Sequence, residues 1–150
     1  MGKTHVVNFA RRFVEVLPQV MRGVLRWQND ALTKGKVTAP QFLVLDLIYT
    51  HGPLKMSELS QEIKISLPAM TGLVARLYKM KMVQRISGEK DRRIIRINLT
   101  STGENTVKAF RQQREKIFSE IFSRFSDQER KDFLGLLVKM KDIILSKKRQ

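Results

Sequence analysis

Apolar residues near the N-terminus recur with the period of an α-helix. They lie at Val6, Phe9, Ala10, Phe13, Leu17, Val20, Met21 and Val24. Because this i, i+3, i+4, i+7 spacing places them on one face, it predicts a long amphipathic helix from Val6 to about Trp27. Pro18 lacks the backbone donor that this helix needs, so we expect the helix to kink or split near Leu17.

A second helix is predicted where the chain offers start signals after Gly35. The segment Thr38-Ala39-Pro40-Gln41 supplies an N-cap, an early proline and a glutamine at the third helical position, which predicts a helix to about Tyr49. His51-Gly52-Pro53 should end it. The run from Met56 to Ile63 then predicts a short third helix, with apolar residues facing inward.

A fourth helix and a hairpin follow. Ser66 is a good N-cap, and Pro68 is tolerated in the first turn. The buried stripe of this helix is expected at Met70, Leu73, Val74 and Leu77. Two β-branched runs, Met82 to Ile86 and Ile94 to Asn98, flank a polar segment and predict a β-hairpin. The centre of the chain is therefore predicted to be a helix-turn-helix followed by a hairpin.

Two capping signatures, Ser101-x-x-Glu104 and Ser126-x-x-Glu129, predict a fifth and a sixth helix. Their apolar stripes are Val107, Phe110, Ile117, Phe118, Ile121 and Phe125 in the fifth, and Phe133, Leu136, Leu137, Met140 and Ile144 in the sixth. These faces exceed what one small domain can cover, so we expect the N- and C-terminal helices to pack together and against a second copy of the chain.

The predicted fold class is mainly α with a small β-hairpin. We divide the chain into an N-terminal dimerisation helix (residues 1–35), a central domain with the helix-turn-helix and the hairpin (36–100), and C-terminal dimerisation helices (101–150). A homodimer is expected because six phenylalanines would otherwise leave a large exposed apolar surface. They are Phe9, Phe13, Phe110, Phe118, Phe122 and Phe133.

The charge of the chain indicates a polyanionic partner. There are 29 Lys and Arg against 14 Asp and Glu, a formal net charge of +15. No apolar run approaches the roughly 20 residues that cross a bilayer, and no signal-peptide pattern is present, so we expect a cytoplasmic protein without a membrane partner. Without cysteine, and with only two histidines, the sequence offers no thiol chemistry and no metal-ligand spacing, so no metal and no cofactor are expected.

The positive charge is concentrated in the helix-turn-helix and hairpin. Residues 64–96 hold nine basic and two acidic residues, a net charge of +7. At the start of the fourth helix, Ser66, Ala69, Thr71 and Gly72 are small or polar enough to approach base edges in a major groove. Nucleic acid is therefore the favoured polyanion.

These residues resemble the MarR (multiple antibiotic resistance regulator) family of winged helix-turn-helix transcription regulators. The most specific part is Asp91-x-Arg93, followed at the family's spacing by Leu99-Thr100 and Gly103. The resemblance implies that the hairpin is the wing, that Leu67 to about Lys79 is the recognition helix, and that the flanking helices form the dimer. It also implies repression of an inverted-repeat operator in double-stranded DNA, relieved by a small-molecule effector.

Two positions depart from the family pattern. Gly72 stands where many members carry a bulkier polar or basic residue, so specificity must come from its neighbours, from the wing or from DNA shape. Lys81 stands where a glycine is usual, so either it adopts a left-handed backbone or the turn is remodelled, at a cost on the order of 1 kcal/mol.

The predicted DNA contacts come from the recognition helix and the wing. They are Ser66, Pro68, Ala69, Met70, Thr71, Arg76, Lys90, Asp91, Arg92 and Arg93. We expect Arg93 to enter a narrow A/T-rich minor groove, and Asp91, on the same side of an extended strand, to hold its guanidinium.

Three other classes of function are weighed against this one. The first is an architectural or nonspecific nucleic-acid binder, for which high charge alone would suffice. The second is an enzyme, which is disfavoured because Asp46, Glu58, Glu62 and the histidines show no acid/base or metal spacing. The third is a membrane-surface protein, which is disfavoured because the apolar helix faces are better used in a dimer core.

Overall fold

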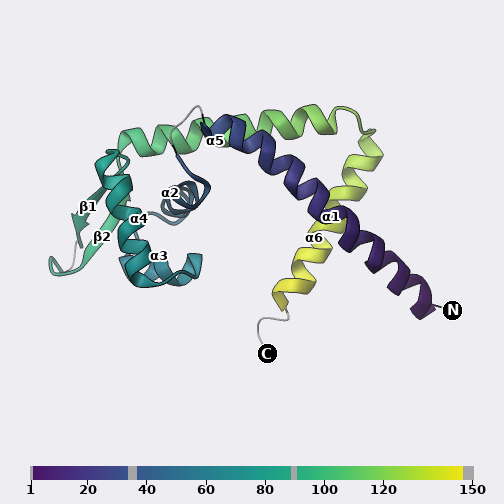
Figure 1. The fold of residues 1–150 in the computed structure, drawn as a ribbon, viewed down its shortest axis with the longest axis horizontal. Helices are drawn as coiled ribbons and strands as arrows, with labels where there is room; N and C mark the ends of the chain where they lie inside the picture. Colours follow the sequence, from purple (N-terminus) through teal and green to yellow (C-terminus); the bar gives the residue numbers. More distant parts are fainter. Residues whose placement is uncertain (1, 34–36, 89–90, 147–150) are drawn as a thin grey trace. The chain divides into compact units, whose positions relative to one another are not determined.

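In this computed structural model, residues 2–33, 37–88 and 91–146 are described. They form helices and one antiparallel hairpin, as the sequence predicted (Figure 1). The elements are α1 (Gly2–Thr33), α2 (Ala39–His51), α3 (Met56–Ile63), α4 (Leu67–Lys79), β1 (Val83–Ser87), β2 (Ile95–Leu99), α5 (Ser101–Phe122) and α6 (Asp127–Ser146). The chain forms two compact units, residues 1–112 and 113–150, with the boundary inside α5.

The helix starts in the first unit follow the predicted capping chemistry. Gln41 Oε1 accepts a hydrogen bond from the Thr38 amide at 2.9 Å, as a capping box requires. Ser66 Oγ accepts from the Ala69 amide at 3.3 Å and so caps α4. Gly52 ends α2 with a φ of +78°, a backbone conformation that residues with a side chain rarely adopt.

Some predicted boundaries are wrong. α1 is continuous through Pro18, so the helix does not split near Leu17; a helix of 32 residues tolerates the loss of one internal hydrogen bond. Both strands begin and end one residue later than predicted, since the pairing places Val83 opposite Leu99. The N-cap of α5 is Thr100 and not Ser101, because the Gly103 amide donates to Thr100 Oγ1 at 3.1 Å.

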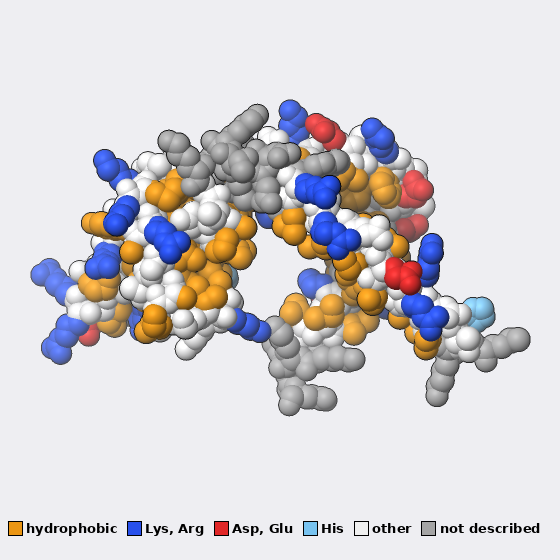
Figure 2. Space-filling view, viewed as in Figure 1, with side chains coloured by type: hydrophobic (Ala, Val, Ile, Leu, Met, Phe, Trp, Pro, Cys, Tyr) orange, Lys and Arg blue, Asp and Glu red, His pale blue; other side chains and the backbone are white. Residues whose placement is uncertain are grey.

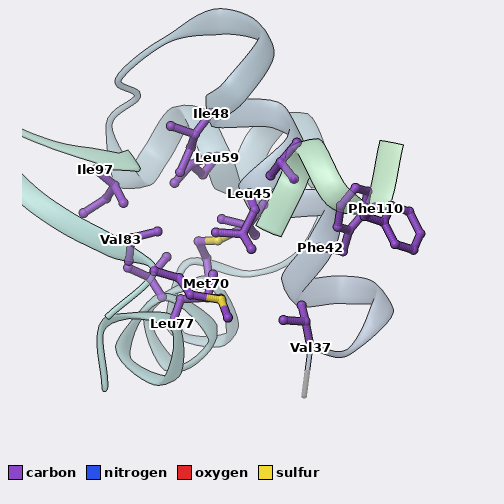
Figure 3. Close-up of a cluster of buried hydrophobic side chains, with 14 residues drawn as sticks. Val37, Phe42, Leu45, Ile48, Leu59, Met70, Leu77, Val83, Ile97 and Phe110 are labelled. Atoms are coloured by element: carbon purple, nitrogen blue, oxygen red, sulfur yellow. The ribbon is translucent and has the colours of Figure 1, made fainter. Parts of the chain in front are cut away.

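The core of the first unit lies under the helix-turn-helix. Met70, Val74 and Leu77 of α4 are buried as predicted, and Leu73 is partly buried. They pack with Leu45, Ile48, Leu59, Val83 and Ile97, which come from α2, α3 and both strands (Figure 3). Phe42 and Phe110 complete this core with ring centroids 3.9 Å apart, so the first half of α5 belongs to the same packed unit.

The turn after α4 is joined to the start of α5 by one hydroxyl group. Lys81 adopts the predicted left-handed backbone, with a φ of +57°. Thr100 Oγ1 donates to the Lys81 carbonyl at 2.6 Å, and the Thr100 amide donates to the Met82 carbonyl at 3.0 Å. A Cβ on Gly103 would lie 2.0 Å from that Met82 oxygen, so this close approach requires glycine.

The second unit is an α-helical hairpin held by aromatic contacts and a cap. The Phe122 ring lies 5.4 Å from Phe125 and 5.5 Å from Phe133, between ring centroids. Ser126 and Glu129 form the predicted capping box, with a Ser126 amide to Glu129 Oε2 distance of 2.8 Å. Hydrogen bonding from the Ser126 backbone amide lowers the pKa of Glu129.

Large apolar side chains on α1 and α6 are exposed within the described chain. On α1 these include Phe9, which is 72% exposed, and on α6 they include Leu136, which is 68% exposed. Figure 2 shows hydrophobic side chains, in orange, along both helices. Phe110 does not belong to this exposed set, contrary to prediction, because it is buried against Phe42.

We predict that Gly103→Ala destabilises the protein while Gly72→Ala does not. The Gly103 Cβ would overlap a backbone oxygen, at a cost on the order of 3 kcal/mol. A Cβ on Gly72 meets nothing within 4 Å, so alanine there should raise stability by roughly 0.5–1 kcal/mol through helix propensity. Urea unfolding of both variants measures this; equal effects would show that the close approach at Gly103 is unimportant.

Candidate nucleic-acid interface

The recognition helix predicted from the sequence, α4, presents one face away from the core. Ser66, Pro68, Ala69, Thr71 and Arg76 are exposed, which makes them available for the predicted DNA contacts. Met70 is wrong as a DNA contact. Its side chain is fully buried, because it lies on the helix stripe that packs against α2 and α3.

The tip of the hairpin is organised by Asp91. Its carboxylate accepts a hydrogen bond from the Arg93 amide at 2.9 Å, and its carbonyl accepts from the Ile94 amide at 3.1 Å. Gly88 lets the chain close here, since a Cβ on it would lie 2.8 Å from the Asp91 carbonyl oxygen. Lys90, another predicted contact, lies outside the described residues.

One part of the prediction about Asp91 is wrong. Residues 92 and 93 form a turn and not an extended strand, and the Asp91 carboxylate bonds the backbone of Arg93 and not its guanidinium. Among the described residues, neither Arg92 nor Arg93 has an ion-pair partner, and both are exposed. Asp91 thus shapes the turn, and within the described part of the chain the two guanidinium groups form no ion pair.

The hairpin is fastened to the helix-turn-helix by contacts that the sequence did not reveal. Leu54, in the loop after α2, exchanges two backbone hydrogen bonds with Ile97 of β2, at 3.1 and 2.7 Å. Arg96 donates to the Pro53 carbonyl at 3.2 Å and lies 3.6 Å from Glu58 Oε2. Arg96 was counted only as a basic residue, because no sequence signal links it to a loop 43 residues away.

A second fastening joins α2 to α5. Arg111 Nε donates to Asp46 Oδ1 at 2.7 Å and Arg111 Nη2 donates to Thr50 Oγ1 at 2.8 Å. Its guanidinium also lies 4.6 Å from the centre of the Tyr49 ring. The hydrogen bond to Asp46 raises the pKa of Arg111. Asp46, considered above as a possible acid or base, is therefore occupied by a structural contact.

The exposed surface around α4 and the hairpin is basic. Figure 2 shows Lys and Arg side chains, in blue, at the hairpin tip and on the surface of the helix-turn-helix. Besides the cations named above, Lys64, Lys79, Lys81 and Arg85 are exposed. No helix in the described part of the chain is long and apolar enough to span a membrane. The same residues hold no cluster of three His, Asp or Glu side chains suited to a metal.

An exposed recognition helix beside a basic hairpin defines a winged helix-turn-helix DNA-binding protein. The profile of the MarR family matches residues 37–95. The chain is 30% identical over 112 residues to YsmB of Bacillus subtilis (strain 168), named an uncharacterized HTH-type transcriptional regulator, covering 75% of this chain and 77% of YsmB. The chain therefore belongs to the MarR family and is a DNA-binding transcriptional regulator.

Two further similarities agree with this. The HTH-type transcriptional repressor MdtR of Bacillus subtilis (strain 168) is 29% identical over 100 residues, covering 67% of this chain and 64% of MdtR. A MarR family protein from Bacillus stearothermophilus has the same fold. Its structure aligns with a TM-score of 0.86 and 24% identity, over 92% of this chain and 96% of that one.

We predict that Arg92→Ala makes DNA binding less sensitive to salt. An exposed guanidinium that neutralises one phosphate contributes about −0.9 to the slope of log K against log salt, so the steepness of the slope should fall by about one unit per wing. Titrations at several salt concentrations measure it. Lys148→Ala, in the terminal run of charges, is the control and should change the slope less. An unchanged slope for Arg92→Ala would mean that this cation does not meet a phosphate.

Proposed function

We propose that this regulator acts as a dimeric repressor that binds an inverted-repeat operator and is released by a small ligand. The observation that carries the proposal is the exposed face of α4 beside a hairpin tip where Arg92 and Arg93 have no ion-pair partner among the described residues. A helix of this kind fits the major groove, while the wing reaches the flanking phosphates and minor groove.

The dimer is supported by the exposed apolar faces of α1 and α6. Side chains such as Phe9 and Leu136 are too numerous and too exposed for a monomer in water. A two-fold dimer presents two copies of α4, so its site should be an inverted repeat with half-site centres roughly 10 bp apart. The division into residues 1–35, 36–100 and 101–150 follows the same proposal.

Repression is supported by the relative MdtR, which is named a repressor. Release by a ligand is the least specific part of the proposal. The regulator MepR of Staphylococcus aureus, which shares the fold at 20% identity and a TM-score of 0.69, has been solved with ethidium bromide bound. Phe42 is buried against Phe110 and therefore does not line an open effector pocket.

The main competing function is nonspecific or architectural DNA binding. It differs from the proposal in one measurable ratio, the affinity for a selected operator against that for random DNA, which is typically 10³ or more for a specific regulator.

The cytoplasmic location expected from the sequence stays a prediction.

We predict that selection of bound genomic fragments yields an inverted repeat and that the protein sediments as a dimer at micromolar concentration. Footprinting should protect both half-sites on the same face of the duplex. A monomer in sedimentation, or protection of one asymmetric half-site, would contradict the proposed geometry. A ratio of operator to random affinity near one would favour the architectural function.

We predict that Arg93→Ala weakens binding most on operators with A/T-rich flanks. A narrow A/T minor groove has enhanced negative potential that attracts an inserted arginine, so the loss should be on the order of 1–3 kcal/mol there and clearly less with G/C flanks. Arg85→Ala on β1 removes the same charge away from the turn and should cost the same on both operators. Equal losses for Arg93→Ala would show that Arg93 supplies charge without reading groove shape.

A further inference from the structure

The exposed face of α4 offers almost no free hydrogen-bond donors over its first nine residues. From Leu67 to Ala75, the exposed side chains are Leu67, Pro68, Ala69, Thr71 and Ala75. Only Thr71 is polar, and its hydroxyl donates to the Leu67 carbonyl at 2.9 Å. Gly72 adds no side chain. The part of the helix that would approach the bases therefore cannot form the bidentate bonds by which Arg, Asn or Gln distinguish purines.

A shallow apolar groove lies beside this face. Lys55, Met56, Ser57, Leu67, Thr71, Ile94 and Ile95 line it, with a volume of about 400 Å³. Leu67 is 50% exposed and Ile95 is 47% exposed, although similar side chains nearby are buried in the core. The groove thus joins the start of the recognition helix to the start of β2.

Charge around the groove indicates what covers its apolar walls. Lys55 lies in its lining, and the turn that precedes Ile94 carries Arg92 and Arg93. An apolar surface edged by cations complements the major groove of double-stranded DNA at a thymine, where the 5-methyl group is flanked by phosphates. A second copy of this chain, with its net charge of +15, would be repelled by these cations.

We propose that α4 reads its half-site through the 5-methyl groups of thymine, with Leu67 and the methyl group of Thr71 as the reading groups. Because the Thr71 hydroxyl donates its proton to the helix backbone, the side chain has no donor left for a base and can offer only its methyl group and an acceptor oxygen. Gly72, one residue on, lets the helix approach the DNA closely. This inference rests on the proposed binding of α4 in the major groove and specifies which base it recognises there.

The experiment removes one methyl group at a time from each side of the contact. Each thymine of the selected operator is replaced by deoxyuridine, which lacks only the 5-methyl group. At one or two positions per half-site the affinity should fall by about fourfold per half-site, as expected for losing one buried carbon group. Positions outside the contact should show no change.

Two variants of Thr71 identify the protein partner. Thr71→Ser removes the methyl group and keeps the hydroxyl. It should weaken binding to the unmodified operator, and at one position the change from thymine to deoxyuridine should then cause no further loss of affinity (the deoxyuridine effect). Thr71→Val keeps a methyl and loses the hydroxyl, so it should retain that effect. Leu67→Ala should abolish the effect at a different or neighbouring position. An unchanged urea midpoint for each variant shows that it is folded.

Three results would overturn the inference. If deoxyuridine is tolerated at every position while the operator is still preferred over random DNA, methyl reading is wrong and the proposed function stands. If the affinity loss caused by deoxyuridine persists in Thr71→Ser but disappears in Thr71→Val, the contact belongs to the hydroxyl and not to the methyl group. The absence of any preferred operator would remove the proposed function and this inference with it.

Discussion

The hydroxyl of Thr100 is the contact on which the geometry of this domain depends. It donates to the carbonyl of Lys81, directly after α4 and before β1, and it accepts from the amide of Gly103 in the first turn of α5. One side chain thus fixes the exit of the recognition helix, the end of the hairpin and the start of the next helix. Two further features belong to this junction. Lys81 has a left-handed backbone, and a side chain at position 103 would overlap the Met82 carbonyl.

This junction gives a physical reason for the spacing of Leu99-Thr100 and Gly103. A threonine at the end of β2 reaches the turn only if α5 begins immediately, and α5 can begin there only if its third residue has no Cβ. The Arg111 bonds to Asp46 and Thr50 then hold α5 to α2 about two turns later. The recognition helix α4 is therefore connected to α5 in two ways: through the turn at Lys81 that follows it, and through α2, against which it packs.

Local signals in the sequence were sufficient for most of the fold. The caps at Thr38, Ser66 and Ser126 act over three residues, and the buried stripe of α4 follows helical periodicity, so both were predictable. Contacts between distant segments were not. Nothing local distinguishes Arg96, which is bonded to Pro53, from the exposed Arg93, or shows that Phe110 packs on Phe42 and not in a dimer. Met70 was predicted both in the buried stripe of the fourth helix and as a DNA contact. The two are incompatible, and its position on the helix places it in the core.

Charge and specificity have different sources on this surface. Phosphate contacts by the basic residues give affinity and position but carry no sequence information, so a net charge of +15 alone cannot select an operator. Selection requires groups that differ between base pairs, and the first nine residues of α4 expose mainly apolar side chains. In the major groove, the one apolar feature that distinguishes base pairs is the thymine methyl. This part of the helix can therefore discriminate directly only where such methyl groups lie, and any further discrimination must come from Arg76 or from the shape of the DNA that the wing contacts.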